Sequence, residues 1–171
     1  MVALERPELV LGMVHNGPHV PSLVAGMPEE LQAAIAEERE KYAPGIEALE
    51  AGDAVQATRL FVEAVLIRPP GGFEQEPKHM RTIWLDNART LPPWMNMSRP
   101  PITCDDLATI EQPTLILKGE HADLFFESVV DTMAQCQPQT EVQVLPGVNH
   151  DGTFNAVEAF TAAILDFLAE H

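Results

Sequence analysis

The sequence predicts an α/β protein, and three observations support that prediction. Two short apolar runs, at residues 113–119 and 141–145, end at glycine or proline-glycine, which is typical of buried strands. A segment with helical periodicity follows each of them, at 127–135 and 155–168. This strand–helix–strand–helix order predicts parallel strands joined by right-handed crossovers. A third apolar run at 9–14 completes a short parallel sheet of about three strands with flanking helices.

Composition and charge exclude several classes of protein. The chain has 171 residues, 46% of them hydrophobic, and a formal net charge of −16. Such an acidic surface repels nucleic-acid phosphates and anionic lipid heads, so we expect neither a nucleic-acid nor a membrane partner. The first residues lack the pattern of a signal peptide, and no apolar stretch reaches the ~20 residues of a membrane span, so we expect a cytoplasmic globular protein.

The two cysteines, Cys104 and Cys136, are too few for a disulfide scaffold or a cysteine-based zinc site. Neither has a histidine at motif spacing, so we interpret both as small buried apolar residues. No phosphate-binding loop, dinucleotide fingerprint or metal-ligand cluster is present, and we therefore expect no cofactor and no metal.

The middle of the chain changes to helical periodicity. Helices are predicted at 28–42, 54–66 and 78–90, and the second of them begins with a capping pattern at Asp53 and Gln56. We therefore divide the chain into a first strand and its loop at 1–20, a helical cap at 21–104, and the second and third strands with their helices at 105–171.

Polar residues follow both C-terminal strands, where ligands of parallel sheets bind. Asp123 comes shortly after the strand at 113–119, and His150 follows the strand at 141–145. A carboxylate that accepts a hydrogen bond from one imidazole nitrogen leaves the other nitrogen free as a general base. We therefore predict His150 and Asp123 as catalytic residues. The alternatives are a structural histidine and a helix N-cap at Asp123.

The residues at 112–120, the Gly-x-x-His segment within 144–150 and the final helical stripe at 159–168 resemble the C-terminal half of an α/β-hydrolase-fold protein. The run at 6–14 resembles that family's approach to its sixth strand, and the helical region matches its inserted lid. The resemblance implies hydrolysis of an ester or related bond in a small-molecule substrate by a nucleophile–histidine–acid triad. His150 occupies the position of that family's catalytic histidine.

The sequence departs from this family at the nucleophile and at the acid. It contains no Gly-x-Ser-x-Gly elbow, and its serines, Ser22, Ser98 and Ser128, stand in other contexts. The position that usually holds the acid is Ala122, and Asp123 is one residue later. We therefore predict a truncated hydrolase, inactive alone, whose nucleophile lies outside this chain. The alternative is a non-catalytic interaction module that associates, for instance as a homodimer, through the open edge of its first strand.

Other polar or aromatic residues allow a functional and a plain interpretation. The loop residues Glu120 and His121 could bind a metal or be solvated, and His15 and His19 could line a pocket or be ordinary loop residues. In the helical region, one polar cluster and one aromatic and methionine group could contact substrate or only belong to the helices: Asp86, Asn87 and Arg89, and Trp84, Trp94, Met95 and Met97.

Overall fold

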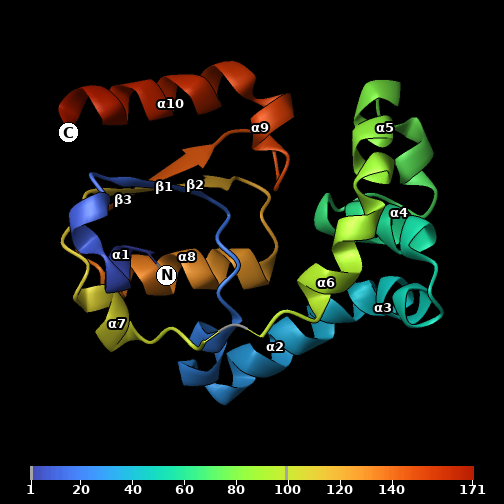
Figure 1. Ribbon diagram of the computed structural model, residues 1–171, viewed down its shortest axis with the longest axis horizontal. Helices are drawn as coiled ribbons and strands as arrows, with labels where there is room; N and C mark the ends of the chain where they lie inside the picture. Colours follow the sequence, from blue (N-terminus) through green and yellow to red (C-terminus); the bar gives the residue numbers. More distant parts are fainter. Residues whose placement is uncertain (1, 99) are drawn as a thin grey trace. The chain divides into compact units, whose positions relative to one another are not determined.

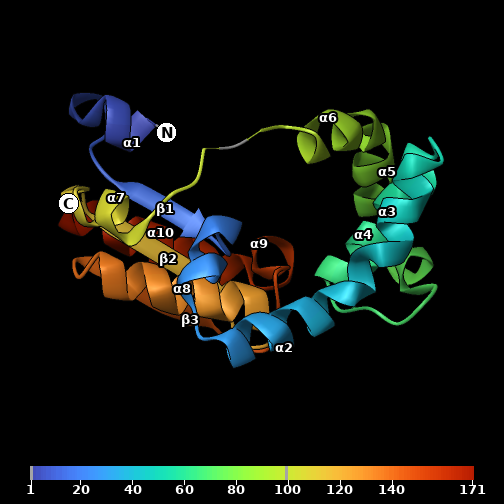
Figure 2. The same ribbon diagram turned by 90° about the horizontal axis from the view of Figure 1, so that it is seen from below.

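The computed structural model describes residues 2–98 and 100–171 and divides the chain into two units (Figures 1 and 2). The sheet unit comprises Met1–Ile35 and Pro101–His171, and the helical unit comprises Ala36–Pro100. Residues 21–35 and 101–104, which the sequence analysis placed in the helical cap, group with the sheet unit in this division. Among the described residues, none of the helices combines the length and the apolarity needed to cross a lipid bilayer.

The sheet has three parallel strands, as predicted, and their order is β1-β2-β3. They are β1 (Met13–Asn16), β2 (Thr114–Gly119) and β3 (Thr140–Leu145). The predicted position of the first strand, 9–14, is wrong. Leu11 is 91% exposed, and pairing begins only where the Met13 amide donates to the Pro113 carbonyl at 2.9 Å. Backbone pairing with β2 extends the strand through two polar residues that the apolar pattern did not include.

Two helices cover the two faces of the sheet (Figure 1). On one face, α8 (Leu124–Cys136) packs its buried Phe125 and Val129 into a cluster with Ile116. On the other face, α10 (Val157–Glu170) packs Phe167 against Leu115 and Leu117 of β2. Each fully buried side chain of this size contributes about 1.5–3 kcal/mol to stability. The central strand β2 is therefore buried on both faces, as a parallel strand requires.

Several short elements complete the sheet unit. Its short α-helices are α1 (Val2–Glu5), α7 (Cys104–Ala108) and α9 (Gly152–Asn155), and its 3-10 helices are Pro7–Leu9 and Pro21–Gly26. The sequence did not predict α7. Thr103 begins it with a capping box, in which the Thr103 hydroxyl accepts from the Asp106 amide and the Asp106 carboxylate accepts from the Thr103 amide.

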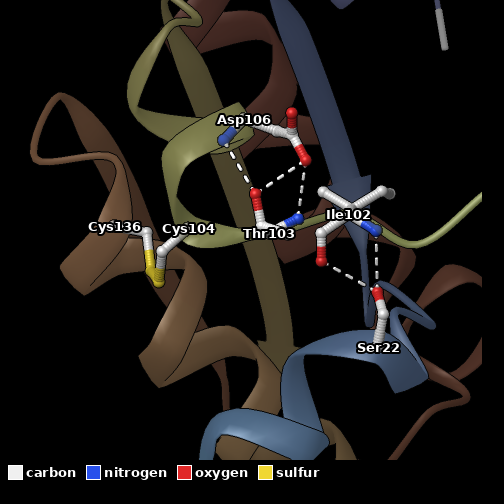
Figure 3. The surroundings of a disulfide bond; sticks show 6 residues. All are labelled: Ser22, Ile102, Thr103, Cys104, Asp106 and Cys136. Carbon is white, nitrogen blue, oxygen red and sulfur yellow. Dashed lines mark hydrogen bonds between the residues drawn. A yellow bond between two sulfur atoms is a disulfide. The ribbon is translucent and has the colours of Figure 1, made fainter.

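A disulfide joins Cys104 of α7 to Cys136 of α8, with the two Cα atoms 5.0 Å apart (Figure 3). The interpretation of both cysteines as small buried apolar residues is therefore wrong. Cys104 is exposed and Cys136 is half-buried. No local pattern predicts this pairing, because the two cysteines are 32 residues apart.

The helical unit is built from α-helices joined by short 3-10 turns. Its helices are the second part of α2 (Glu29–Arg39), then α3 (Ala43–Glu50), α4 (Ala54–Val65), α5 (Lys78–Asp86) and α6 (Leu91–Met95), and its 3-10 turns are Glu40–Tyr42, Gly72–Gln75 and Ala88–Thr90.

The predicted cap of α4 is present, since the Asp53 carboxylate accepts from the Gln56 amide at 2.9 Å. Helix α3 was not among the predicted helices; its Pro44 lies in the first turn, where a proline is tolerated. The third predicted helix, 78–90, is interrupted after Asp86 by a 3-10 turn. A new helix, α6, then begins at Leu91 and includes the Pro92-Pro93 pair in its first turn.

Candidate active site

The carboxyl ends of the three parallel strands lie at one edge of the sheet. Asn16, the last residue of β1, pairs with Leu117 of β2, and Gly119 at the end of β2 pairs with Leu145 at the end of β3. The loops that follow these strands carry His19, Asp123 and His150. The predicted catalytic residues Asp123 and His150 therefore follow neighbouring strands on the same edge.

Gly119 allows the loops after β2 and β3 to touch. A Cβ atom at Gly119 would lie 1.9 Å from the Asn149 carbonyl oxygen, a distance that only glycine avoids. The amide of His121 donates to the Val148 carbonyl at 2.9 Å and ties the loops together. The backbone of one loop thus fixes the position of the other, so the two loops that carry Asp123 and His150 have a defined position relative to each other.

Asp123 is the N-cap of α8. Its Oδ1 accepts a hydrogen bond from the Phe126 amide at 3.0 Å, and the residue is only 5% exposed. The structural alternative for Asp123 is therefore present, but it does not exclude the predicted one, because a carboxylate has lone pairs for several donors. The Asp123 charge also acts on His150, where it raises the imidazole pKa.

The His150 ring is enclosed from two sides. It stacks on Phe126 of α8, with ring centroids 4.6 Å apart and planes 14° from parallel. On another side it meets Gly17, where an added Cβ would lie 2.5 Å from the His150 Nδ1 atom. Gly17 also has a φ of +50°, so both its backbone conformation and its contact with the ring require glycine.

Burial dominates the protonation of His150. It lowers the pKa of this imidazole below its usual value, and the negative charges of Asp123 and Asp151 oppose the shift only in part. The ring is therefore neutral at neutral pH. A neutral imidazole beside a carboxylate is the form that can accept a proton.

Asp151 is a second buried carboxylate that the sequence reasoning missed. Its Oδ1 accepts from the Asn149 amide at 3.1 Å and its Oδ2 from the Asn155 side chain at 2.7 Å. These bonds fix the turn that presents His150. The Asn155 side chain is used in this bond to Asp151, and α10 begins after Ala156 without a side-chain cap. The polar Asn-His-Asp run was the available signal for this turn.

The structure also places the two remaining histidine candidates. The His19 ring lies 5.0 Å from that of Phe125 and 6.4 Å from that of Phe126, so it joins the aromatic group on which His150 stacks. His15 belongs to β1, and burial lowers the pKa of its imidazole. His19 is therefore closer to the candidate site than the plain loop interpretation implied.

The other candidates have local structural partners. The Glu120 carboxylate accepts from the Gly147 amide at 2.8 Å and bridges the two loops. The Asn87 side chain donates to the Ile83 carbonyl within the helical unit. The Ser22 hydroxyl exchanges hydrogen bonds with the backbone of Ile102, and Ser128 is buried on α8.

One exposed cluster has the spacing of metal ligands. Glu141 on β3 and Glu170 and His171 at the end of α10 have ligand atoms within 4.8 Å of one another. His171 Nε2 lies 3.2 Å from a Glu141 carboxylate oxygen, which accounts for the approach as an ion pair or hydrogen bond. Glu141 lies near the amino end of β3, at the opposite end of the strand from His150.

Comparisons with known proteins give a fold. No protein-family model matches the sequence, and no curated protein matches it either. Several solved structures do, among them the following three. A hydrolase from Pseudomonas aeruginosa PA01 shares 21% identity, with 98% of this chain and 58% of that chain covered and a TM-score of 0.66. MGS-M2, an α/β-hydrolase enzyme from a Medee basin deep-sea metagenome library, shares 16% identity, with 98% of this chain and 59% of that chain covered and a TM-score of 0.65.

The third is Est816, described as an N-acyl homoserine lactone degrading enzyme. It shares 18% identity over 97% of this chain and 61% of its own, with a TM-score of 0.63. The chain thus spans about three fifths of the length of the structures that it matches. This three-stranded parallel sheet with its helices has the fold of the C-terminal part of the α/β hydrolases.

Proposed function

We propose that this chain carries the proton-transfer part of a hydrolase that cleaves esters or related bonds of small molecules. The observation that supports this most is the placement of His150 after β3, between Phe126 and Gly17, where burial lowers the pKa of its imidazole and the Asp123 charge opposes that shift. The α/β-hydrolase fold is consistent with it.

In this proposal, His150 takes the proton of an attacking hydroxyl and later returns it to the leaving group. Asp123 stabilises the imidazolium that forms between these two steps. Burial destabilises that imidazolium, whereas the negative charges of Asp123 and Asp151 stabilise it. The balance holds the base neutral before the reaction and allows its charge to develop during the reaction.

The attacking group belongs, in this proposal, to residues outside the chain. Two of its three serines do not offer a nucleophile beside His150: Ser22 is bound to the backbone of Ile102, and Ser128 is buried on α8. The matched structures are longer by about two fifths of their length, which leaves room for a nucleophile-bearing part. That part could belong to a longer polypeptide or to a separate chain.

The helical unit would act as a lid in this proposal. Its exposed apolar side chains suit an apolar acyl or ring substituent: Ile83, Trp94, Met95 and Met97. Est816 degrades a lactone, according to its description, so cyclic as well as open esters are suitable test substrates.

Ester turnover with matched variants tests the proposal. The chain alone should show no saturable turnover of p-nitrophenyl esters, measured as release of p-nitrophenolate. Genomic sequence upstream should encode a strand–Gly-x-Ser-x-Gly–helix segment, and adding that segment should restore turnover. In the restored enzyme, His150→Gln should lower kcat by roughly 10³- to 10⁴-fold, and Asp123→Asn somewhat less.

The matched control is His121→Gln, on the same loop as Asp123, which should leave turnover within about twofold. Saturable turnover by the chain alone that survives His150→Gln would contradict the proposal.

A second candidate function is an interaction module that associates through β1. In the described residues, β1 pairs with β2 only, so its other edge has unpaired backbone groups, and Val14 on it is 36% exposed. Analytical ultracentrifugation tests this alternative. Val14→Lys should abolish a dimer that forms through this edge, whereas Val55→Lys, at an exposed position on α4, should not. A monomer at all concentrations would exclude it.

A further inference from the structure

The first residues of the sheet unit after the helical unit are fastened at two points (Figure 3). The Ser22 hydroxyl accepts from the Ile102 amide and donates to the Ile102 carbonyl, both at 2.9 Å. Two residues later, the Cys104–Cys136 disulfide ties α7 to the last residue of α8. A covalent bond therefore closes the connection between two elements that are otherwise held by side-chain packing.

Noncovalent contacts hold α7 as well. Its capping box joins Thr103 and Asp106, and Leu107 and Ile110 are buried in the core that α8 shares. The disulfide can therefore open while α7 keeps a place in the fold. An element with both kinds of attachment can respond to reduction by loosening locally instead of unfolding the whole unit.

Both cysteines line a surface hollow of about 990 Å³ within the sheet unit. The hollow lies between the 3-10 helix Pro21–Gly26, the start of α2, α7 and α8. Cys104 is exposed and lines this hollow, so we expect a small thiol there to reach its sulfur. Reactivity of a disulfide requires such access.

The hollow is acidic. Asp105 and Asp131 line it, and Asp106 follows in α7. Lys118 lies 3.4 Å from Asp131 and offsets part of this charge. Lys118 and Arg6 are the only basic residues of the sheet unit's sequence, against 16 acidic ones. A thiolate that approaches Cys104 therefore meets a negative potential.

We propose that Cys104–Cys136 is a thiol–disulfide exchange site that selects thiols carrying positive charge near the reacting sulfur. The thiolate attacks the exposed Cys104 sulfur, a mixed disulfide forms there, and Cys136 leaves as a thiolate that takes a proton from water. A second thiolate attacks the reagent sulfur of the mixed disulfide. The reagent is thereby oxidised to its disulfide, and Cys104 is released as the second thiol.

Reduction should loosen α7 and leave the His150 site in place. Cys136 ends α8, whereas Phe126, which stacks on His150, lies near its beginning. Ten residues of helix separate the two, about 15 Å. The exchange site therefore acts on the fastening of α7 and not on the proposed base.

Reduction rates with three small thiols test the proposal. Cysteamine carries a positive group beside its sulfur, 2-mercaptoethanol carries no charge there, and 3-mercaptopropionate carries a negative group. The rate at which each thiol reduces the protein disulfide is divided by the rate at which the same thiol reduces bis(2-hydroxyethyl) disulfide, at equal thiolate concentration. At 20 mM salt, cysteamine should exceed 3-mercaptopropionate by about tenfold. At 0.5 M salt, screening should reduce this ratio to about twofold or less.

Charge variants locate the selectivity. Asp105→Asn with Asp131→Asn should lower the ratio, whereas Asp166→Asn, an exposed position on α10, should leave it unchanged. Amide hydrogen exchange should quicken in α7 after reduction and stay constant at Phe126. A ratio near one at low salt would overturn the proposal. So would cysteines that stay open to alkylation after incubation with bis(2-hydroxyethyl) disulfide.

Discussion

The two units of this chain differ strongly in net charge. The sheet unit has 16 acidic and 2 basic residues, a net charge of −14, whereas the helical unit has 10 acidic and 8 basic residues, a net charge of −2. Almost all of the net charge of −16 therefore belongs to the unit that holds the candidate site. In the helical unit, charges are paired locally: Glu74 bonds both Arg59 and Arg81.

This difference bears on substrate and stability. A site surrounded by a negative potential disfavours anionic substrates, so the proposed hydrolase should prefer neutral or cationic esters. Two glycines of the sheet unit, Gly17 and Gly119, are in close contact with neighbouring groups at the site. In the helical unit, Gly52 and Gly71 have positive φ but open space around them. Gly17 and Gly119 thus constrain the backbone at the site, whereas Gly52 and Gly71 serve turns of the helical unit.

The largest expected effect separates these two kinds of glycine. Gly119→Ala should lower the free energy of unfolding by about 4–5 kcal/mol, because the added methyl meets the rigid Asn149 carbonyl. Gly52→Ala should cost only about 1–2 kcal/mol, since its positive φ is strained but nothing is near. Urea denaturation of both variants measures this. Equal losses would show that the two loops after β2 and β3 move apart easily.

Reduction of the disulfide comes next and affects one unit only. A closed loop of about 32 residues predicts a loss of about 3–4 kcal/mol when it is opened, through the entropy of the unfolded chain. Both tryptophans, Trp84 and Trp94, lie in the helical unit, so their fluorescence reports on that unit alone. We expect the circular dichroism transition to shift on reduction and the tryptophan transition to stay. A shift in both would mean that the units unfold together.

The sequence predicted most of what periodicity and strand ends control. The parallel sheet, the helices α4 and α8, and the placement of Asp123 and His150 at one sheet edge follow from local patterns that tertiary packing reinforces. Prediction from the sequence failed where contacts between residues far apart in the chain determine the structure. β1 is defined by pairing with residues a hundred positions later, and the disulfide by the meeting of α7 with α8.

The environment of His150 was also beyond sequence reasoning. Its stacking on Phe126 depends on how α8 packs, and its contact with Gly17 depends on the pairing of β1 with β2. The Gly17-Pro18 pair after an apolar run predicts a turn, but it does not predict which side chain will contact Gly17. Asp151 was missed because its role is set by the partners Asn149 and Asn155 across one turn.

A smaller effect should come from salt. Raising the ionic strength from 20 mM to 0.5 M screens repulsion among the 16 acidic residues of the sheet unit and should raise its stability by about 1 kcal/mol. The helical unit should change less, because screening also weakens attractive pairs such as Arg68 with Glu76. Circular dichroism and tryptophan fluorescence again separate the units. A larger salt effect on fluorescence would reverse the comparison.

The smallest expected effect concerns pH and the candidate base. Burial lowers the pKa of His150 below its usual value of 6.5, so at pH values between the two the folded protein binds fewer protons than the unfolded chain. Stability should therefore be full above pH 6.5 and should fall as the pH drops through the lowered pKa, below which the loss stays constant. His150→Gln should remove this part of the pH dependence and leave the part due to His15, whose pKa is also lowered by burial. Titration of the His150 ring by NMR measures the pKa shift directly. A midpoint at or above pH 6.5 would mean that the charges of Asp123 and Asp151 outweigh burial. The ring would then be partly charged before it takes a proton from the attacking group.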